Sequence, residues 1–236
     1  MVANVGRQLS CKGGTSRLIL IPIRSEERKG SAKLGTSSAT GPSNNSNVGG
    51  ACYDPFRDCY WRIVAESNGW MYRFDKATGL WDNPIGGAQH NLNGGYLSLT
   101  RLPNHDCLLI GTTGFGWRVF DCATRTFHTP TVTGTGALFG FGGEAQPHWI
   151  DELGGCVAWD NSTNTTAITL ITPGANPRTS LVLSTLPVAG GNAVTPPARR
   201  ANGTYGRLFP WRSKRILVLI NGNGASDAFY YRYGAL

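Results

Sequence analysis

Short apolar and aromatic runs, bounded by turn residues, recur along the chain after residue 48. Runs of this length between turn residues are typical of β-strands rather than of helices. The residues between the runs include Pro-x-x-Asp and Asn-Gly, which tight hairpins favour. The pattern therefore predicts an all-β fold. In the first group of runs, the predicted strands cover residues 50–54, 59–65, 69–75 and 78–82.

A repeated motif organises these strands. Residues 74–81 read FDKATGLW and residues 120–127 read FDCATRTF, so Phe-Asp-x-Ala-Thr-x-x-aromatic recurs at an offset of 46 residues. Upstream of each copy, Asp58 and Asp106 correspond at an offset of 48 residues. Self-similarity at about 40–50 residues, with several short strands per unit, is typical of a β-propeller. Two weaker copies cover residues 148–159 and 203–232.

The first unit resembles the units of the kelch-like β-propellers, which are related in fold to the propeller of galactose oxidase. It reads YDPFRD over residues 53–58, then a short apolar strand, then FDKATGLW over 74–81. The stretch 202–232 is similar to the last blade of many bacterial and phage kelch-like chains. The kelch double glycine after the second strand is missing after Ala65 and after Ile110.

The resemblance implies a propeller of about four kelch-like blades over residues 49–236, preceded by an extended arm over residues 1–48. The last unit has only three strands, so its outer strand is missing. Residues 17–23 form an apolar run of strand length. We expect this run to pair with residues 226–233 and close the ring, because an unpaired sheet edge is a liability. The alternative is that it adds a strand to a neighbouring subunit.

Composition and charge narrow the class of protein. Of the 236 residues, 32 are Gly and only 15% are charged, against about 25% in an average chain, which disfavours helical bundles and coiled coils. The formal net charge is +8, and residues 1–48 hold seven Lys/Arg and two Glu. This arm is interpreted either as a segment that contacts an acidic surface or as a solubilising tail. Its candidate partner-binding residues are Arg7, Lys12, Arg17, Leu18, Ile19, Leu20, Ile21, Arg24, Arg28 and Lys29.

The six cysteines and four histidines predict no metal site and no cofactor. No Cys-x-x-Cys occurs, and the histidines lack the paired spacing of zinc ligands. The cysteines lie in apolar runs, so we expect buried free thiols. A cross-strand disulfide between Cys52 and Cys59, which flank a predicted turn, is the alternative.

The chain lacks the common motifs of catalytic residues, so we predict that it is not an enzyme. The chain has no Gly-x-Ser-x-Gly elbow, phosphate-binding loop or His-Glu-x-x-His motif. The copper ligands of the galactose-oxidase family have no match here. Asp151 and Glu152 are adjacent and would point to opposite faces of a strand, so they cannot form an acid–base pair. We interpret them as turn residues.

Tryptophans provide the candidate binding residues. Trp70 follows Asn68-Gly69, and Trp117 follows Gly114-Phe115-Gly116, so each is predicted at a strand start just after a hairpin turn. Exposed there, Trp70 and Trp117 beside Asn68 would offer a platform for stacking a sugar. The alternative for each tryptophan is packing between sheets.

These features predict a non-catalytic structural or binding module of a large oligomeric assembly. The specific expectation is a bacteriophage virion component, in the tail or as a capsid appendage, that docks by its arm and exposes propeller loops. Its partners would be protein subunits rather than nucleic acid. Arg outnumbers Lys by 17 to 5, which favours interfaces. A carbohydrate-binding propeller is the alternative, followed by a galactose-oxidase-like or lyase-like enzyme.

The expected location follows from two absences in the sequence. No run reaches the roughly 18 apolar residues of a membrane span, so we expect no membrane insertion. The first residues lack the layout of a secretory signal. We therefore expect the protein to be made in the cytoplasm and to end in a virion or other large assembly.

Overall fold

The structure is a computed structural model in which the chain divides into two units, Met1–Leu34 and Gly35–Leu236. The described residues all belong to the second unit. The predicted arm over residues 1–48, including the apolar run 17–23, lies outside them. The described residues are 50–64, 69–86, 90, 92, 97–112, 116–135, 146–159, 168–186, 208–220 and 228–233.

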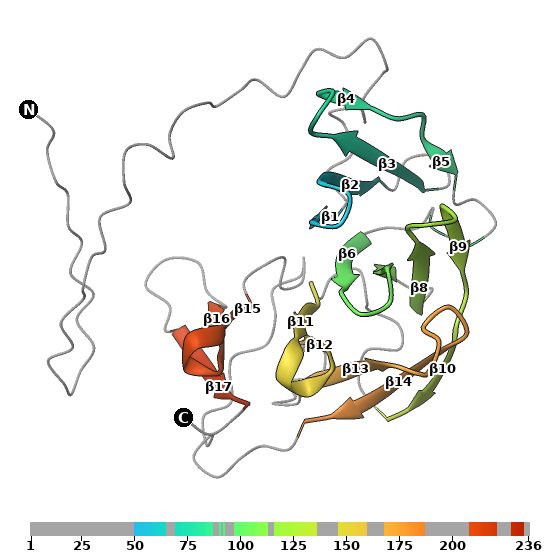
Figure 1. Cartoon of the computed structure of the whole chain (residues 1–236). Coiled ribbons are helices and arrows are strands. Elements are labelled where there is room, and N and C mark those ends of the chain that lie inside the picture. The colour runs from blue at the N-terminus through green and yellow to red at the C-terminus, as the bar shows by residue number, and fades with distance from the viewer. Residues whose placement is uncertain are drawn as a thin grey trace, which may run out of the picture. The chain divides into compact units, whose positions relative to one another are not determined.

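Within this described part, the secondary structure is almost entirely β-strand, as predicted (Figure 1). Two short 3₁₀ helices occur, η4 (Asp151–Leu153) and η5 (Arg212–Lys214). None of the described helices has the length and apolar character needed to cross a membrane.

Sheet 1 contains the strands of the first predicted unit. Its order is β1-β2-β3-β4, all antiparallel, and β5 pairs with the same strand, β3, as β4 does. Of the outer strand that was predicted over residues 78–82, only Leu80–Trp81 is a strand, and β5 lies beyond the predicted range. The other three predicted strands are confirmed to within one residue at each end. The bounds are β1 (Ala51–Asp54), β2 (Cys59–Val64), β3 (Trp70–Asp75), β4 (Leu80–Trp81) and β5 (Ile85–Gly86).

Sheet 2 is a four-stranded antiparallel meander in the order β6-β7-β8-β9. All six residues of β7, CLLIGT, are buried, because this strand has a neighbouring sheet on each face. The bounds are β6 (Leu97–Leu102), β7 (Cys107–Thr112), β8 (Gly116–Asp121) and β9 (Thr126–His128).

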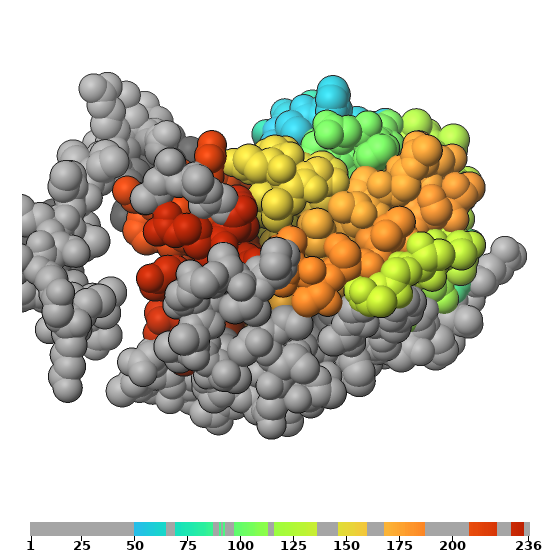
Figure 2. Space-filling model, turned by 90° about the horizontal axis from the view of Figure 1, so that it is seen from below, coloured from blue at the N-terminus to red at the C-terminus, as the bar shows by residue number. Residues whose placement is uncertain are grey.

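Sheet 3 is a meander of four strands with a fifth added at its outer edge. β10 follows the last strand of sheet 2 in the chain but pairs in parallel with β14. Figure 2 shows this strand, in lime, lying along the orange of β14. The outer edge of sheet 3 is thereby paired. The bounds are β10 (Thr131–Gly134), β11 (His148–Ile150), β12 (Gly155–Ala158), β13 (Thr169–Pro173) and β14 (Ser180–Thr185).

Sheet 4 has three described antiparallel strands, as predicted for the last unit. They are β15 (Leu208–Trp211), β16 (Ile216–Ile220) and β17 (Ala228–Arg232). β16 is apolar at all five positions, ILVLI, a pattern typical of a strand that is covered on both faces.

A residue with positive φ precedes the second strand of every meander. These residues are Asp58, Asp106, Gly154 and Arg215, with φ values of 45°, 51°, 59° and 48°. The left-handed conformation reverses the chain between the first two strands of each sheet, and Gly and Asp adopt it most readily. The predicted correspondence of Asp58 with Asp106 is confirmed, and it extends to sheets 3 and 4.

The second repeated turn is built by the Phe-Asp-x-Ala-Thr motif. In sheet 1, Asp75 Oδ1 accepts hydrogen bonds from the backbone N–H groups of Ala77 and Thr78, at 2.8 and 3.1 Å. In sheet 2, Asp121 Oδ1 accepts the equivalent bonds, at 2.8 and 3.0 Å. The aspartate replaces the backbone partners that the turn cannot supply, which explains its recurrence.

Successive sheets pack face to face and bury three apolar clusters. Between sheets 1 and 2, the rings of Trp61 and Phe120 lie 5.1 Å apart. Leu109 and Cys156 belong to the cluster between sheets 2 and 3, and Val157 and Leu217 belong to the cluster between sheets 3 and 4. The first strands β1, β6, β11 and β15 are neighbours in that order, so the four repeats follow one another in space as in sequence (Figure 1).

The five described cysteines are all free. Cys52 lies opposite Trp61, and Cys59 opposite Asp54, so the alternative of a disulfide between these two cysteines is wrong. Burial raises the pKa of Cys52 to about 12 and that of Cys59 to about 11. These thiols are therefore protonated near neutral pH and serve as packing groups.

Candidate functional site

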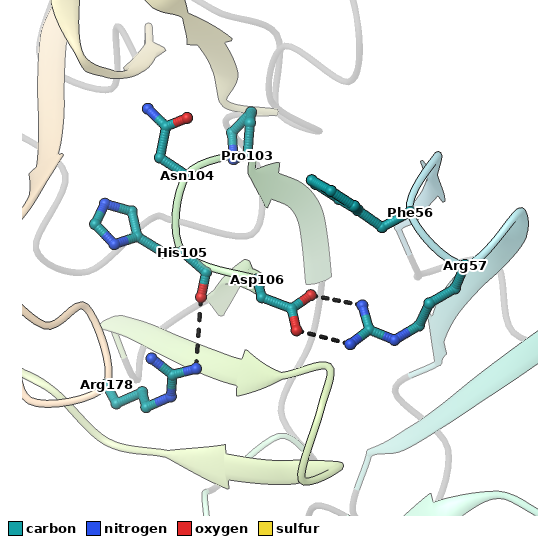
Figure 3. A pocket seen from close by; sticks show the side chains of 7 residues that line it. All are labelled: Phe56, Arg57, Pro103, Asn104, His105, Asp106 and Arg178. Carbon is teal, nitrogen blue, oxygen red and sulfur yellow. Dashed lines mark hydrogen bonds and ion pairs between the residues drawn. The ribbon is translucent and has the colours of Figure 1, made fainter.

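A pocket of about 610 Å³ opens where turns from three successive sheets meet (Figure 3). The turn between β1 and β2 contributes its first side, the turn between β6 and β7 its centre, and the turn between β13 and β14 its third side. The residues that line it are Phe56, Arg57, Pro103, Asn104, His105, Asp106 and Arg178.

Arg57 joins sheet 1 to sheet 2 across the pocket. Its Nη1 donates to Asp106 Oδ1 at 2.5 Å and its Nη2 donates to Asp106 Oδ2 at 2.7 Å, a bidentate pair (Figure 3). Nη1 also donates to Asp54 Oδ2 at 3.1 Å. The hydrogen bond with Asp106 is the largest influence on Arg57 and raises its pKa well above the usual value. The guanidinium is thus charged and already neutralised by two carboxylates.

Asp54 is the buried anchor beneath this pair. It is fully buried and accepts hydrogen bonds from Trp61 Nε1 at 3.3 Å and from the Phe56 N–H at 3.1 Å. Arg101 of β6 lies 3.4 Å away, so the carboxylate also contacts sheet 2. Burial acts to raise the pKa of Asp54, but the hydrogen bonds from Arg57, Trp61 and Phe56 outweigh it, and the pKa is lowered.

Arg178 joins sheet 3 to sheet 2 in the same manner. Its Nε donates to Asp121 Oδ2 at 2.6 Å. Its Nη2 donates to the His105 carbonyl oxygen at 3.4 Å (Figure 3). The hydrogen bond with Asp121 raises the pKa of Arg178. Partial burial, with the nearby Arg178 charge, lowers the pKa of the His105 imidazole, which favours its neutral form.

Phe56 is the exposed aromatic residue of the pocket, with 76% of its surface accessible. The guanidinium carbon of Arg101 lies 4.7 Å from the ring centroid, so one ring face is stacked on a cation. A phenyl ring fixed in this way can stack a flat apolar surface, and Asn104 offers an amide elsewhere on the pocket lining.

Three possible metal ligands lie beside the pocket. Single ligand atoms of Asp54, Asp106 and Cys122 are all within 4.8 Å of one another. Both carboxylates, however, are bonded to Arg57, and burial raises the pKa of the Cys122 thiol well above its usual value. A protonated thiol and two carboxylates that share a guanidinium do not form a cation site.

The predicted sugar platform is not assembled. Trp117 is 1% exposed and belongs to the core between sheets 2 and 3, so its expected role as an exposed ring is wrong. Trp70 is half-buried on β3, beside Gly86 of β5. Asn68 lies outside the described residues, as do all the predicted partner-binding residues of the arm.

Asp151 and Glu152 lie in the 3₁₀ turn η4, which confirms their interpretation as turn residues. Asp151 accepts a hydrogen bond from Trp149 Nε1 at 2.8 Å and one from Arg212 Nη1 at 3.3 Å. Arg212 also donates to the Trp149 carbonyl oxygen at 2.8 Å and so joins sheet 4 to sheet 3.

Sequence reasoning missed the pocket residues. Phe56 and Arg57 lie inside the YDPFRD turn that was used only to recognise a repeat. Because Arg57 lies in a turn that recurs in successive repeats, a contact between this arginine and the next repeat could have been predicted. The pairing of Arg178 with Asp121 spans 57 residues and leaves no local signal.

Comparisons with known proteins give no match. No family model matches the chain, no curated protein matches it, and no solved structure matches it.

Proposed function

We propose that the chain is a non-catalytic structural or binding module, and that its four sheets are blades of a kelch-like β-propeller. The repeated turns support the second part: a residue with positive φ directly precedes the second strand of each of the four described sheets. The face-to-face packing of consecutive meanders also fits the propeller architecture.

One observation carries the non-catalytic role. Both arginines that line the pocket are held by aspartates of neighbouring sheets, Arg57 by Asp106 and Arg178 by Asp121. Charged groups committed to each other in this way stabilise the sheet junctions and are not available to bind an anion or to transfer a proton. The pocket is therefore a surface of paired charges with an exposed aromatic ring, which suits recognition more than reaction.

The proposed context is a large assembly to which the basic arm docks. The bacteriophage virion stays a prediction from the sequence. The test is the mass of the purified chain in solution by light scattering, with and without residues 1–48. We expect the number of copies per particle to fall when the arm is removed, with an unchanged thermal unfolding temperature for the remainder. The same number of copies per particle for both proteins would overturn the docking role of the arm.

A second candidate function is carbohydrate binding, which the exposure of Phe56 favours. Stacking of a sugar ring on a phenyl or indole face, with amide and imidazole groups at the rim, is a common use of such surfaces. The test is glycan binding on an array followed by calorimetry. We expect Phe56→Ala to abolish binding and Tyr230→Ala, an exposed aromatic of sheet 4, to leave it unchanged. Equal binding by both variants would place any glycan elsewhere.

A further inference from the structure

The second strand of each sheet has two faces, and each sheet junction brings together the same pair of them. The residue two positions after the positive-φ residue packs on the preceding sheet. The residue three positions after it packs on the following sheet. We call these the rear face and the forward face. The rear-face residues are Leu108, Cys156 and Leu217, and the forward-face residues are Trp61, Leu109 and Val157.

The same count assigns two faces that no described sheet covers. In sheet 1 the rear-face position is Tyr60, and in sheet 4 the forward-face position is Val218. In the described part of the chain, no sheet precedes sheet 1 and none follows sheet 4.

The forward face of sheet 4 has the composition of a core. Strand register aligns Phe209, Val218 and Tyr230 across its three strands, and Ile216, Ile220 and Trp211 lie on the same face. Tyr230 is 64% exposed and Trp211 is 52% exposed. Contiguous exposed apolar side chains of this size mark an interaction surface.

The rear face of sheet 1 is aromatic. Register aligns Tyr53, Tyr60, Phe74 and Trp81 across the sheet. The rings of Tyr53 and Tyr60 lie 5.1 Å apart, and they are 41% and 42% exposed. An aromatic face with hydroxyl groups at its rim is the composition found at protein interfaces that also contact water.

We propose that the forward face of sheet 4 docks on the rear face of sheet 1 of a second copy of this chain. Tyr53 and Tyr60 on sheet 1, and Trp211 and Tyr230 on sheet 4, are exposed within one chain, so these parts of the two faces do not cover each other there. The junction would repeat the packing that is present at three places inside the chain, between a forward face and a rear face. A head-to-tail contact of this kind closes when two copies are related by a twofold axis.

Two copies would then form a ring of eight sheets, which is within the usual range of about four to eight blades. This step rests on the proposed propeller. The proposed contact makes a second copy of the chain one partner in the assembly, and this contact does not involve residues 1–48.

The test uses the full chain with one charged substitution on either face. Val218→Lys places a charge on the forward face of sheet 4, and Tyr60→Lys places one on the rear face of sheet 1. Val182→Lys is the matched control, because Val182 is an exposed valine on β14, outside both faces. Tyr230→Lys is the second forward-face variant, because its side chain is exposed and its replacement cannot disturb the core.

We expect sedimentation to show a two-copy species for the unchanged chain and for Val182→Lys. Each of the three face variants alone should be a single copy. An equimolar mixture of Val218→Lys and Tyr60→Lys should recover the two-copy species, since each such pair retains one intact junction. No recovery in the mixture would overturn the proposal, as would dissociation by the variants of one face only.

The result separates this inference from the proposed function. If the unchanged chain is a single copy, or if the face variants keep the two-copy species, the head-to-tail contact is wrong. Docking of the arm to a different partner is then judged by the deletion of residues 1–48.

Discussion

Arg57 and Asp106 are 49 residues apart in sequence, yet two parallel hydrogen bonds of 2.5 and 2.7 Å join their side chains. The pair connects the first turn of sheet 1 with the first turn of sheet 2. Arg178 and Arg212 make related connections between sheets 2 and 3 and between sheets 3 and 4. An arginine therefore bridges every junction between consecutive sheets in the described part of the chain.

Replacing Arg57 tests the first of these bridges. Arg57→Ala leaves the fully buried Asp54 with fewer hydrogen bonds and removes the contact with Asp106. We expect a loss of about 2–3 kcal/mol in the free energy of unfolding, because unpairing a buried carboxylate is costly. Urea unfolding followed by tryptophan fluorescence measures it. Lys214→Ala, an exposed cation on sheet 4, should change stability by less than about 0.5 kcal/mol, and equal effects would contradict the bridge.

The pair of Arg178 with Asp121 allows a double-mutant cycle. The carboxylate is nearly buried and also accepts two backbone hydrogen bonds, so the pair is held in one geometry. We expect Arg178→Met and Asp121→Asn to show a coupling energy of about 1–2 kcal/mol. Additive effects of the two substitutions would mean that the pair does not join sheets 2 and 3.

Acid should destabilise the junction between sheets 3 and 4 through His148. Its Nε2 is buried without a hydrogen-bond partner, and burial lowers its pKa from the ordinary value of 6.5. The unfolded chain binds the proton of His148 more readily than the folded chain does. The contribution of His148 to the free energy of unfolding is therefore complete above about pH 6.5 and is lost as the pH drops through the lowered pKa. His90 and His105 act in the same direction.

The measurement is the urea midpoint between pH 7.5 and 5. The unchanged chain should lose stability over this range, and His148→Gln should lose less of it, since the substituted side chain does not titrate. An identical pH dependence for the two proteins would show that His148 does not contribute.

The described cysteines should be unreactive in the folded protein. Burial raises the pKa of Cys59 and Cys107 to about 11, and Cys156 is completely buried. In a Cys11→Ser variant, which removes the cysteine outside the described residues, we expect no thiol to react with an aromatic disulfide reagent at pH 7 within minutes. All five should react in urea. Rapid reaction of one thiol in the native protein would reveal an open junction.

The sequence predicted what local chemistry determines. The FDKATGLW and FDCATRTF motifs specify their own turns, because the Asp75 and Asp121 side chains bond to the following backbone. The strands of sheet 1 followed from the same local signals. The parallel pairing of β10 with β14 was not predicted, because it joins segments of two different repeats.

The candidate site was harder to predict for a related reason. Trp117 looked like an exposed ring in sequence, since it follows a glycine-rich turn, but it is buried between its own sheet and sheet 3. Whether a strand residue is exposed depends on which sheets flank it, and that is a property of the packed repeats. The pairing of Arg57 with Asp106 depends on the same long-range order.

The most direct measurement is the mass of the full chain in solution, by light scattering over a range of concentrations. If the chain is a module of an assembly with open terminal faces, the mass should exceed the 25.3 kDa of one copy. A mass of one copy at every concentration would contradict that account and would describe a self-contained protein.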